Sequence, residues 1–389
     1  MNDVAVVEGS SSVVSAASDG SVHCWRVDTA SSSFSTVTTP GSGIAGTHVV
    51  PPRVSDISLL RTIDPCEGEV LSVTHFETRS ASLIAFSTQE KVRTWDLRTA
   101  CEPFSLSMGP EFGHLTSMAV GDDSNWMVTG TGRGFVGLWD VRFHKLVKIL
   151  RHNTYQPIMR LGAALGPLPW NDCNDSRPYI VVGCGTNETA VFDAISGSCN
   201  RCLRVLHPEW EHLSQSTLPQ SCYSLPTLQN ISIPSEWTRR TFGMNSAITR
   251  MVLDRASVPE PRILSFVGKL GGSGNNHLIT GGGDGFIRYW DLASPLKCYT
   301  MSGLCSSQPK PIYESVSLPN GSAKLFLCRQ MSKPTIEETV SSKIPQMMER
   351  GAISAQQHHR DAILDLKKID YPTKGLLSCS RDGTIKFWK

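Results

Sequence analysis

The chain has 389 residues, a length that allows one large domain or two to three ordinary ones at roughly 100–200 residues each. Lys and Arg number 37 and Asp and Glu number 35, so the formal net charge is only +2. This balance excludes a polybasic chain that binds nucleic acid or an anionic membrane through bulk charge. The apolar share of 40% suffices for a core and excludes a disordered tail or a coiled coil.

The start of the chain predicts neither a secretory signal nor a membrane anchor. Residues 1–8 contain no basic stretch followed by a long apolar one. Apolar runs elsewhere, such as 180–182, are far shorter than the roughly 18 residues of a membrane span. The 12 cysteines lie mostly alone inside apolar runs, where a free thiol behaves as a small hydrophobe. These features favour a soluble protein in a reducing, cytoplasmic setting.

Residues 14–25 predict a β-hairpin that ends in an aromatic residue. An apolar stretch leads to Asp19-Gly20, and an alternating stretch then runs to Trp25. Asp-Gly between two such stretches is a strong hairpin signal, because Gly accepts the positive φ of the turn. Similar copies recur at 83–95, 127–139, 180–192, 278–290 and 376–388. The closing aromatic residues of the six copies are Trp25, Trp95, Trp139, Phe192, Trp290 and Trp388.

The spacing of the copies predicts the blades of a β-propeller with polar insertions. Trp95 and Trp139 lie 44 residues apart, the length of one four-stranded blade. Larger gaps require insertions, and the polar tracts at about 29–64, 207–241 and 330–357 are expected to be loops. A short helix is possible at 335–343 from its capping-box spacing. Phe192, Trp290 and Trp388 are separated by two gaps of 98 residues each. A degenerate blade that the pattern does not reveal is the alternative to an insertion in each of these gaps.

These copies resemble WD repeats. The dipeptide that names the repeat stands at Trp95-Asp96, Trp139-Asp140 and Trp290-Asp291, and Gly113-His114 matches the opening pair. The resemblance implies an all-β propeller of residues 1–389 with six recognisable blades, as in a seven-bladed propeller that lacks about one N-terminal blade. It also implies a hydrogen-bonded tetrad in the last blade, formed by His359, Ser378, Asp382 and Trp388.

Several copies depart from the WD pattern. Gln89 and Arg133 replace the turn Asp, Phe192 replaces the Trp, and Trp25 is followed by Arg26. We expect packing to hold these blades more than a tetrad does. The last repeat ends at its third strand, and the sequence leaves open whether residues before Val13 supply a fourth.

A closer resemblance covers nearly the whole chain. Residues 94–98, 134–143, 358–366 and 378–389 are similar to the C-terminal propeller in the family of large regulatory subunits of class III phosphatidylinositol 3-kinase complexes. That family has a kinase-like domain and helical repeats before the propeller, so the chain is expected to be a fragment without them. The resemblance implies a scaffold for the lipid kinase catalytic subunit and its coiled-coil subunits in endosomal sorting and autophagy. Contact with endosomal or autophagic membranes would be indirect, through the complex.

Two motifs suggest an enzyme, but their context argues against one. Gly132–Gly137 matches G-x-G-x-x-G, yet it runs into a β pattern, whereas a phosphate loop must open a helix. His359-Arg360-Asp361 spells the catalytic triplet of protein kinases, but Leu366 stands where the metal-binding Asn would be. No Asp-Phe-Gly follows. We therefore predict no catalytic residue and no cofactor.

Two further clusters predict no ligand site. Cys199 and Cys202 have metal-ligand spacing with His207 nearby, but no second such pair completes four zinc ligands. Trp237 beside Arg239-Arg240 is too little for a nucleic-acid stacking platform. We predict neither metal nor nucleic acid.

Three tryptophans outside the closing positions are candidate interface anchors. Trp170, Trp210 and Trp237 lie in polar segments that contain Pro, as loops on a rigid scaffold do when they bind partners. Packing under their own loops is the more ordinary explanation.

Three functions remain at this point. The first is the regulatory scaffold described above. The second is an unrelated WD-repeat adaptor, for example a ubiquitin-ligase substrate receptor or a trafficking scaffold. The third is the protein-kinase activity of the longer relatives, for which this chain lacks the motifs.

Overall fold

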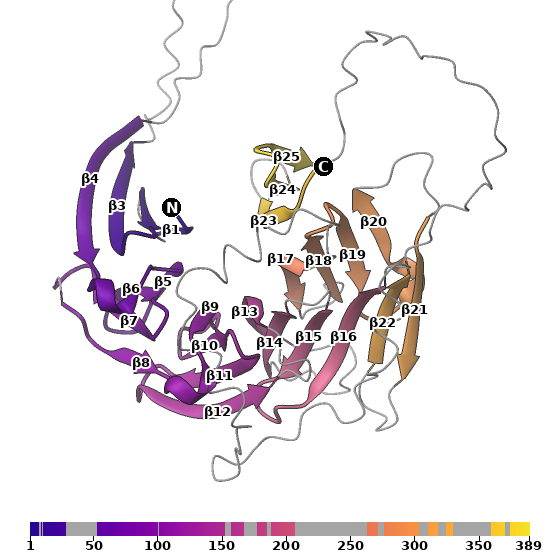
Figure 1. The fold of residues 1–389 in the computed structure, drawn as a ribbon, viewed down its shortest axis with the longest axis horizontal. Helices are drawn as coiled ribbons and strands as arrows, with labels where there is room; N and C mark the ends of the chain where they lie inside the picture. Colours follow the sequence, from indigo (N-terminus) through magenta and orange to yellow (C-terminus); the bar gives the residue numbers. More distant parts are fainter. Residues whose placement is uncertain are drawn as a thin grey trace, which may run out of the picture. The chain divides into compact units, whose positions relative to one another are not determined.

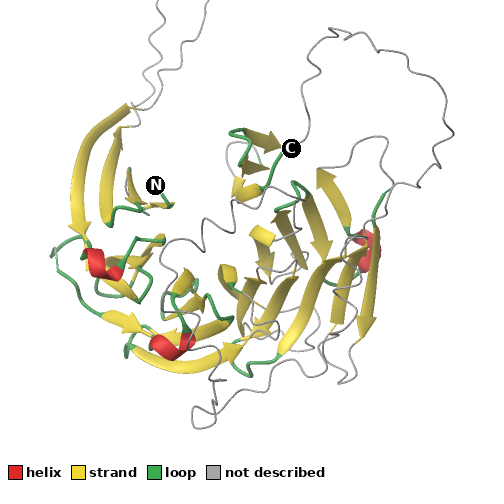
Figure 2. Cartoon of the chain, in the orientation of Figure 1, coloured by secondary structure: helices red, strands yellow, loops and turns green. Residues whose placement is uncertain are grey.

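The computed structural model describes residues 1–7, 9, 11–28, 53–99, 101–151, 157–166, 177–184, 188–206, 263–270, 276–302, 310–317, 324–329, 359–369 and 374–389. These residues form strands, turns and three short 3-10 helices, with no α-helix among them (Figure 2). The 3-10 helices are η1 (Pro65–Glu67), η2 (Pro110–Phe112) and η4 (Pro295–Lys297).

Within these ranges, six antiparallel or mixed sheets follow one another along the chain (Figure 1). The strands of the first three sheets are β1 (Asp3–Val6), β2 (Ser12–Ala16), β3 (Ser21–Asp28) and β4 (Arg53–Thr62); β5 (Ser72–Glu77), β6 (Ser82–Ser87), β7 (Lys91–Asp96) and β8 (Ser105–Ser107); and β9 (Leu115–Val120), β10 (Trp126–Thr131), β11 (Phe135–Asp140) and β12 (Lys145–Arg151). In each of these sheets, strands that follow one another in sequence are neighbours.

The remaining three sheets differ in strand number. The fourth has the order β13-β14-β15-β16-β22-β21, the fifth β17-β18-β19-β20 and the last β23-β24-β25. Their strands are β13 (Ile158–Gly166), β14 (Arg177–Cys184), β15 (Glu188–Asp193), β16 (Cys199–Leu206), β17 (Ile263–Leu270), β18 (Asn276–Gly282), β19 (Ile287–Asp291), β20 (Tyr299–Ser302), β21 (Ile312–Ser317), β22 (Lys324–Arg329), β23 (Ile363–Ile369), β24 (Gly375–Ser380) and β25 (Ile385–Trp388).

The six closing aromatic residues each stand on the third strand of a different sheet. These strands are β3, β7, β11, β15, β19 and β25. The predicted fold class, an all-β WD-repeat propeller with six recognisable blades, is therefore confirmed.

The chain divides into two compact units. One comprises Met1–Gly132 and Gly137–Lys148, and the other comprises Arg133–Val136 and Ile149–Lys389. The single domain that the sequence suggests stays a prediction, and each unit is described by itself.

Tight turns between the second and third strands set the register of the hairpins. In the first sheet the Asp19 carboxylate accepts the Ser21 N–H at 2.9 Å, and Gly20 has φ +81°. In the last sheet the Asp382 carboxylate accepts the Thr384 N–H at 2.9 Å, and Gly383 has φ +79°. The predicted Asp-Gly turns form because the carboxylate closes the turn and Gly accepts the left-handed conformation.

Each unit packs its sheets face to face. In the first unit, Val14 and Val22 of the first sheet pack with Ile84 and Phe86 of the second. In the second unit, Leu203 of the fourth sheet packs with Trp290 of the fifth. A smaller core joins the fifth and last sheets, where Ile279, Ile287 and Met301 meet Ile363, Leu366, Leu376 and Trp388.

The prediction that residues 29–64 form a loop is wrong for their last part. Residues 53–62 form β4, the fourth strand of the first sheet, with Ile57 opposite Trp25 and Leu59 opposite His23. Polar composition indicated a loop because most side chains of this edge strand face solvent, and an edge strand does not need an apolar pattern.

A hairpin that the sequence did not reveal extends the fourth sheet. Strands β21 and β22 lie in the second gap of 98 residues, and β22 pairs parallel with β16, with Leu203 opposite Phe326. Tyr313 of this hairpin packs edge-on against Trp290 of the fifth sheet, with ring centroids 5.5 Å apart. The hairpin thus belongs to one sheet by hydrogen bonds and to the next by packing.

The first residues of the chain pair within the first sheet. Val6 lies opposite Val13 and Val4 opposite Ser15, so β1 is the neighbour of β2. In the part of the chain that the structure describes, the last sheet has three strands, as the sequence indicated.

Some predictions fall on residues outside those that the structure describes. These are the insertions at 207–241 and 330–357 and the short helix at 335–343. Among the described residues, no helix has the length and apolar character needed to cross a membrane.

Candidate functional site

The four residues of the predicted tetrad come together in the last sheet. The Ser378 hydroxyl lies 2.6 Å from His359 Nε2 and accepts the Trp388 indole N–H at 2.7 Å. His359 Nδ1 lies 3.4 Å from the Asp382 carboxylate. The chain therefore connects strand β24, strand β25, the turn between them and the segment before β23 through one side-chain network.

Burial and charge set the protonation of this tetrad. Burial lowers the pKa of His359, against the opposing pull of Asp382, so the imidazole is neutral near pH 7. Burial raises the pKa of Asp382, but hydrogen bonds from the Arg360 and Thr384 backbone N–H groups outweigh it and hold that pKa well below its ordinary value. A neutral imidazole and an ionised carboxylate match the hydrogen bonds observed.

The indole-to-hydroxyl bond recurs in three other sheets. Trp25 donates to Ser15 at 2.7 Å, Trp139 to Thr129 at 2.9 Å and Trp290 to Thr280 at 2.9 Å. The hydroxyl residue precedes the Trp by ten positions in every case, as Ser378 precedes Trp388. This spacing is a local signal that sequence inspection can find.

The second and fourth sheets lack that bond for different reasons. Phe192 is buried and has no donor, and Val182 stands at the hydroxyl position. Trp95 lies opposite Ile84, and Phe86 stands at the hydroxyl position two residues on. The turn at Gln89 in the second sheet is one residue shorter than the Asp-Gly turns, because the Thr88 N–H donates to the carbonyl of Lys91, three residues later. The pairing of β6 with β7 is therefore shifted by one residue relative to the other hairpins.

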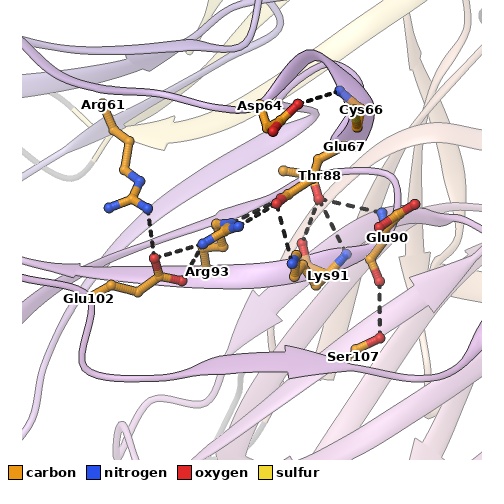
Figure 3. A network of polar contacts seen from close by, with 10 residues as sticks. All are labelled: Arg61, Asp64, Cys66, Glu67, Thr88, Glu90, Lys91, Arg93, Glu102 and Ser107. Carbon is orange, nitrogen blue, oxygen red and sulfur yellow. Dashed lines mark hydrogen bonds and ion pairs between the residues drawn. The ribbon is translucent and has the colours of Figure 1, made fainter.

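The second sheet has instead a network of charged side chains around Arg93 (Figure 3). Arg93 of β7 makes a two-pronged contact with Glu67 through Nε at 2.9 Å and through Nη2. Its Nη1 contacts both Glu102 oxygens at 2.8 and 2.7 Å. Lys91 lies 3.2 Å from Glu67, and Arg61 of β4 lies 2.9 Å from Glu102.

The network links the first sheet to the second through charge. The Arg93 hydrogen bond holds the pKa of Glu67 below its ordinary value, with burial acting in the opposite direction. Arg61 also lies over the Trp95 ring, 5.2 Å from its centroid. Because Glu67 and Glu102 each contact more than one cation, the network has a structural role. The sequence does not reveal it, because no recurring motif links Arg93 to Glu67, 26 positions away.

The Asp of each WD-type dipeptide closes its own loop. Oδ1 of Asp96, Asp140, Asp193 and Asp291 accepts the backbone N–H two residues later, at 2.8, 2.9, 2.8 and 2.9 Å respectively. This is an Asx-turn, in which the carboxylate replaces a backbone acceptor. These four acids therefore have a conformational role in the loops.

The motifs that suggested an enzyme have structural roles. Gly132–Gly137 spans the turn between β10 and β11, at 132–134, and the first three residues of β11, and it opens no helix. Asp361 of the kinase-like triplet pairs with Arg381 at 2.7 Å and accepts the Ala362 N–H at 2.7 Å. Its carboxylate is thus engaged within the last sheet.

The cysteine pair is split between separate contacts. Cys199 Sγ lies 3.3 Å from the Arg201 carbonyl, and Cys202 Sγ lies 2.9 Å from Glu188 Oε1. Burial and the Glu188 charge raise the pKa of the Cys202 thiol well above its ordinary value. Within the part of the chain that the structure describes, no group of three or more His, Cys, Asp or Glu residues could hold a metal ion.

The candidate interface tryptophans stay untested. Trp170, Trp210 and Trp237 all lie outside the described residues, as do His207 and Arg239-Arg240. Their proposed roles stay predictions.

Comparison with known proteins supports the interpretation of the repeats. The family described as "WD domain, G-beta repeat" matches residues 352–389, which include the tetrad. Over 389 residues the chain is 27% identical to "Serine/threonine-protein kinase VPS15" of Arabidopsis thaliana, covering 99% of this chain and 24% of that protein. The chain thus spans about a quarter of the length of this relative.

Two further relatives match smaller or more divergent stretches. "Probable serine/threonine-protein kinase vps15" of Dictyostelium discoideum is 29% identical over 146 residues, covering 37% of this chain and 7% of that protein. "Anaphase-promoting complex subunit cdc20" of the same organism is 22% identical over 325 residues, covering 80% of this chain and 56% of that protein. The chain has the fold of a WD-repeat β-propeller, its last repeat matches the WD family, and over nearly its whole length it is similar to one part of VPS15.

Proposed function

We propose that this chain is a non-catalytic protein-interaction scaffold that acts as a regulatory subunit of the class III phosphatidylinositol 3-kinase complex. The observation that carries the proposal is the similarity to VPS15 over 99% of this chain. VPS15 is the homologue of phosphoinositide 3-kinase regulatory subunit 4, the kind of subunit that the sequence resembles. The partners are the lipid kinase catalytic subunit and its coiled-coil subunits, in endosomal sorting and autophagy.

A scaffold role suits the physical character of the chain. The tetrad of the last sheet, the Asx-turns and the Arg93 network stabilise sheets and loops, and rigid loops are what a scaffold presents to its partners. The protein is cytoplasmic in this proposal, and reaches endosomal or autophagic membranes only through the complex. The kinase names of the relatives refer to proteins about four times as long as this chain.

The test is affinity capture of the tagged chain from cells, with quantitative mass spectrometry of what it retains. The proposal expects enrichment of the lipid kinase and its coiled-coil subunits over a bait of another WD-repeat propeller. The absence of these subunits from a capture of folded chain would contradict it. A parallel assay with labelled ATP and a general protein substrate expects no phosphate transfer above that of a mock purification.

A second candidate is a WD-repeat adaptor outside the lipid kinase complex. The similarity to the anaphase-promoting complex subunit cdc20 over 80% of this chain favours it. Capture of ubiquitin-ligase subunits, without the lipid kinase, would select this candidate.

A further inference from the structure

The loop between β19 and β20 is closed by short-range hydrogen bonds. Oδ1 of Asp291 accepts the N–H of Ala293 at 2.9 Å and that of Ser294 at 3.0 Å, which forms the Asx-turn of the fifth sheet. The 3-10 helix η4 follows, and the Lys297 N–H donates to the Ser294 carbonyl at 3.2 Å. These residues all belong to the unit that includes Ile149–Lys389. Both backbone groups of Ser294 are therefore used inside the loop.

The side chain of Ser294 has no such role in the loop. Ser294 is the residue before η4, yet its hydroxyl forms no capping hydrogen bond with that helix. The residue is partly exposed. Its backbone is extended, with φ −140° and ψ 119°, as steric contact with a following proline favours. The loop thus presents a serine hydroxyl on an extended backbone directly before Pro295.

The residues after Ser294 match those that one class of protein kinase selects. Pro295 stands at the first position after the serine and Lys297 at the third. Proline-directed kinases bind an extended substrate, and proline suits their pocket because it brings no N–H that needs an acceptor. Cyclin-dependent kinases, one branch of this class, also favour a basic side chain at the third position, which negative groups of the kinase attract. Leu296 is 91% exposed, and Lys297 is exposed as well.

This pattern occurs once in the chain. In the full sequence Ser or Thr precedes Pro at two places, Thr39-Pro40 and Ser294-Pro295. Ser42 stands at the third position after Thr39, so the first place lacks the basic residue. Thr39 therefore provides an internal comparison for Ser294.

We propose that Ser294 is a phosphorylation site for a proline-directed kinase of the cyclin-dependent branch. Oγ of Ser294 forms a bond to the γ-phosphorus of MgATP, and the bond from that phosphorus to the ADP oxygen breaks. The hydroxyl proton passes to the catalytic aspartate of the kinase. The kinase must open η4 to bind the segment. That helix is a single turn of three residues with the weaker hydrogen-bond geometry of a 3-10 helix, so opening it costs little.

A phosphate on Ser294 would disrupt the Asx-turn. It adds about −1.5 to −2 charge at pH 7. The Asp291 carboxylate accepts the N–H of Ser294 itself, so the two negative groups lie within one turn and repel each other. We expect the carboxylate to release the N–H groups of Ala293 and Ser294, and the loop to open. Phosphorylation would thereby change one of the loops of the scaffold, and this inference does not depend on which partners the scaffold binds.

The test incubates the whole folded chain with a purified cyclin-dependent kinase and MgATP, and mass spectrometry locates and quantifies the phosphate. The proposal expects phosphate at Ser294, and Ser294→Ala should abolish it. Lys297→Ala should lower the initial rate by about tenfold, as the loss of one charge-assisted contact does. Thr39 should react more slowly than Ser294 by a similar factor. A synthetic peptide of residues 288–301 is the control for recognition without the fold.

Hydrogen exchange of the phosphorylated chain measures the effect on the loop. The amides of Ala293 and Ser294 should exchange at least about tenfold faster than in the unmodified chain. The Ile195 amide donates to Asp193 at 2.8 Å in the Asx-turn of the fourth sheet, so it is the matched control and should not change. Asp291→Asn keeps an oxygen acceptor without the negative charge. Phosphorylation of that variant should leave the exchange of the two loop amides unaltered.

Several results would overturn the proposal. They are the absence of phosphate from both the chain and the peptide, phosphorylation of the peptide but not of the folded chain, a rate at Thr39 equal to that at Ser294, and unchanged exchange of the loop amides after full modification. The outcome is separable from that of the proposed function. If Ser294 is phosphorylated while the lipid kinase subunits are absent from the capture, the site stands and the role in that complex is wrong. If those subunits are recovered while the kinase leaves Ser294 unmodified, the scaffold role stands and the site is wrong.

Discussion

The second and last sheets stabilise the same hairpin arrangement with different polar groups. In the last sheet the neutral His359 forms a hydrogen bond with Ser378, which also accepts the Trp388 indole N–H. The other ring nitrogen of His359 lies 3.1 Å from Thr384 Oγ1 and 3.4 Å from the Asp382 carboxylate. In the second sheet no hydroxyl faces Trp95, and Arg93 instead holds the two carboxylates of Glu67 and Glu102. A blade therefore requires its polar groups to be paired and does not require one particular set of residues.

Removing the centre of the charged network should destabilise the chain most. Arg93→Met leaves Glu67 and Glu102 without their main partner, and we expect it to lower the free energy of unfolding by about 3 kcal/mol. Urea titration followed by tryptophan fluorescence measures the loss. Arg98→Met is the control, because that side chain is 60% exposed and should change stability by less than about 0.5 kcal/mol. Equal losses in the two variants would mean that the network contributes no more to the free energy of unfolding than the exposed Arg98 does.

The tetrad should contribute somewhat less. Asp382→Ala removes the acceptor of the Arg360 and Thr384 N–H groups, and we expect a loss of roughly 1–3 kcal/mol. Thermal unfolding measures it. An unchanged melting temperature would show that the turn holds without its carboxylate.

The two sheets should differ in their response to pH. In the folded chain burial lowers the pKa of His359, so the unfolded chain, with a His pKa of about 6.5, takes up the proton first. Stability is therefore fully present above about pH 6.5 and falls as the pH drops below it, by no more than about 1.4 kcal/mol per pH unit for one proton. Glu67 contributes no slope there, because its lowered pKa matters only below the ordinary Glu range. Urea titrations at pH 7.5 and 5.5 test this, and His359→Gln should reduce the slope to the part that His277 contributes, since burial lowers the pKa of that imidazole as well.

Salt should produce the weakest response. Arg61 and Glu102 are partly exposed, so the contribution of their ion pair should be screened by added salt. We expect Arg61→Met to cost about 0.5–1 kcal/mol at 50 mM NaCl and clearly less at 500 mM. A cost that does not change with salt would indicate that the contact of Arg61 with the Trp95 ring matters more than its charge.

Local patterns allowed much of the fold to be predicted. Each closing aromatic residue lies a fixed distance after its hairpin turn, and Asp-Gly at 19–20, 284–285 and 382–383 marks the turn itself. The tetrad of His359, Ser378, Asp382 and Trp388 was visible for the same reason. Such features depend on residues within about 30 positions of one another.

Features that depend on distant residues were not predictable. Strand β4 is exposed along most of its length, so its sequence carries no apolar signal. The pairing of β22 with β16 joins segments far apart in the chain. It uses backbone groups, which every residue type has, so the sequence does not indicate which strands pair. The Arg93 network was not predictable for another reason: Glu67 and Glu102 lie only 26 and 9 positions from Arg93, but no recurring spacing marks either of them as its partner.

The parallel pairing of β16 with β22 also constrains how the protein is made. Leu206 of β16 pairs with Arg329 of β22, more than a hundred residues later. During synthesis the ribosome releases β13–β16 well before their last neighbour exists, so a nascent chain carries an incomplete fourth sheet while the whole fifth sheet is being translated. Closing so long a loop costs entropy before the contacts form, which makes this step a candidate for the slow phase of folding and for chaperone binding.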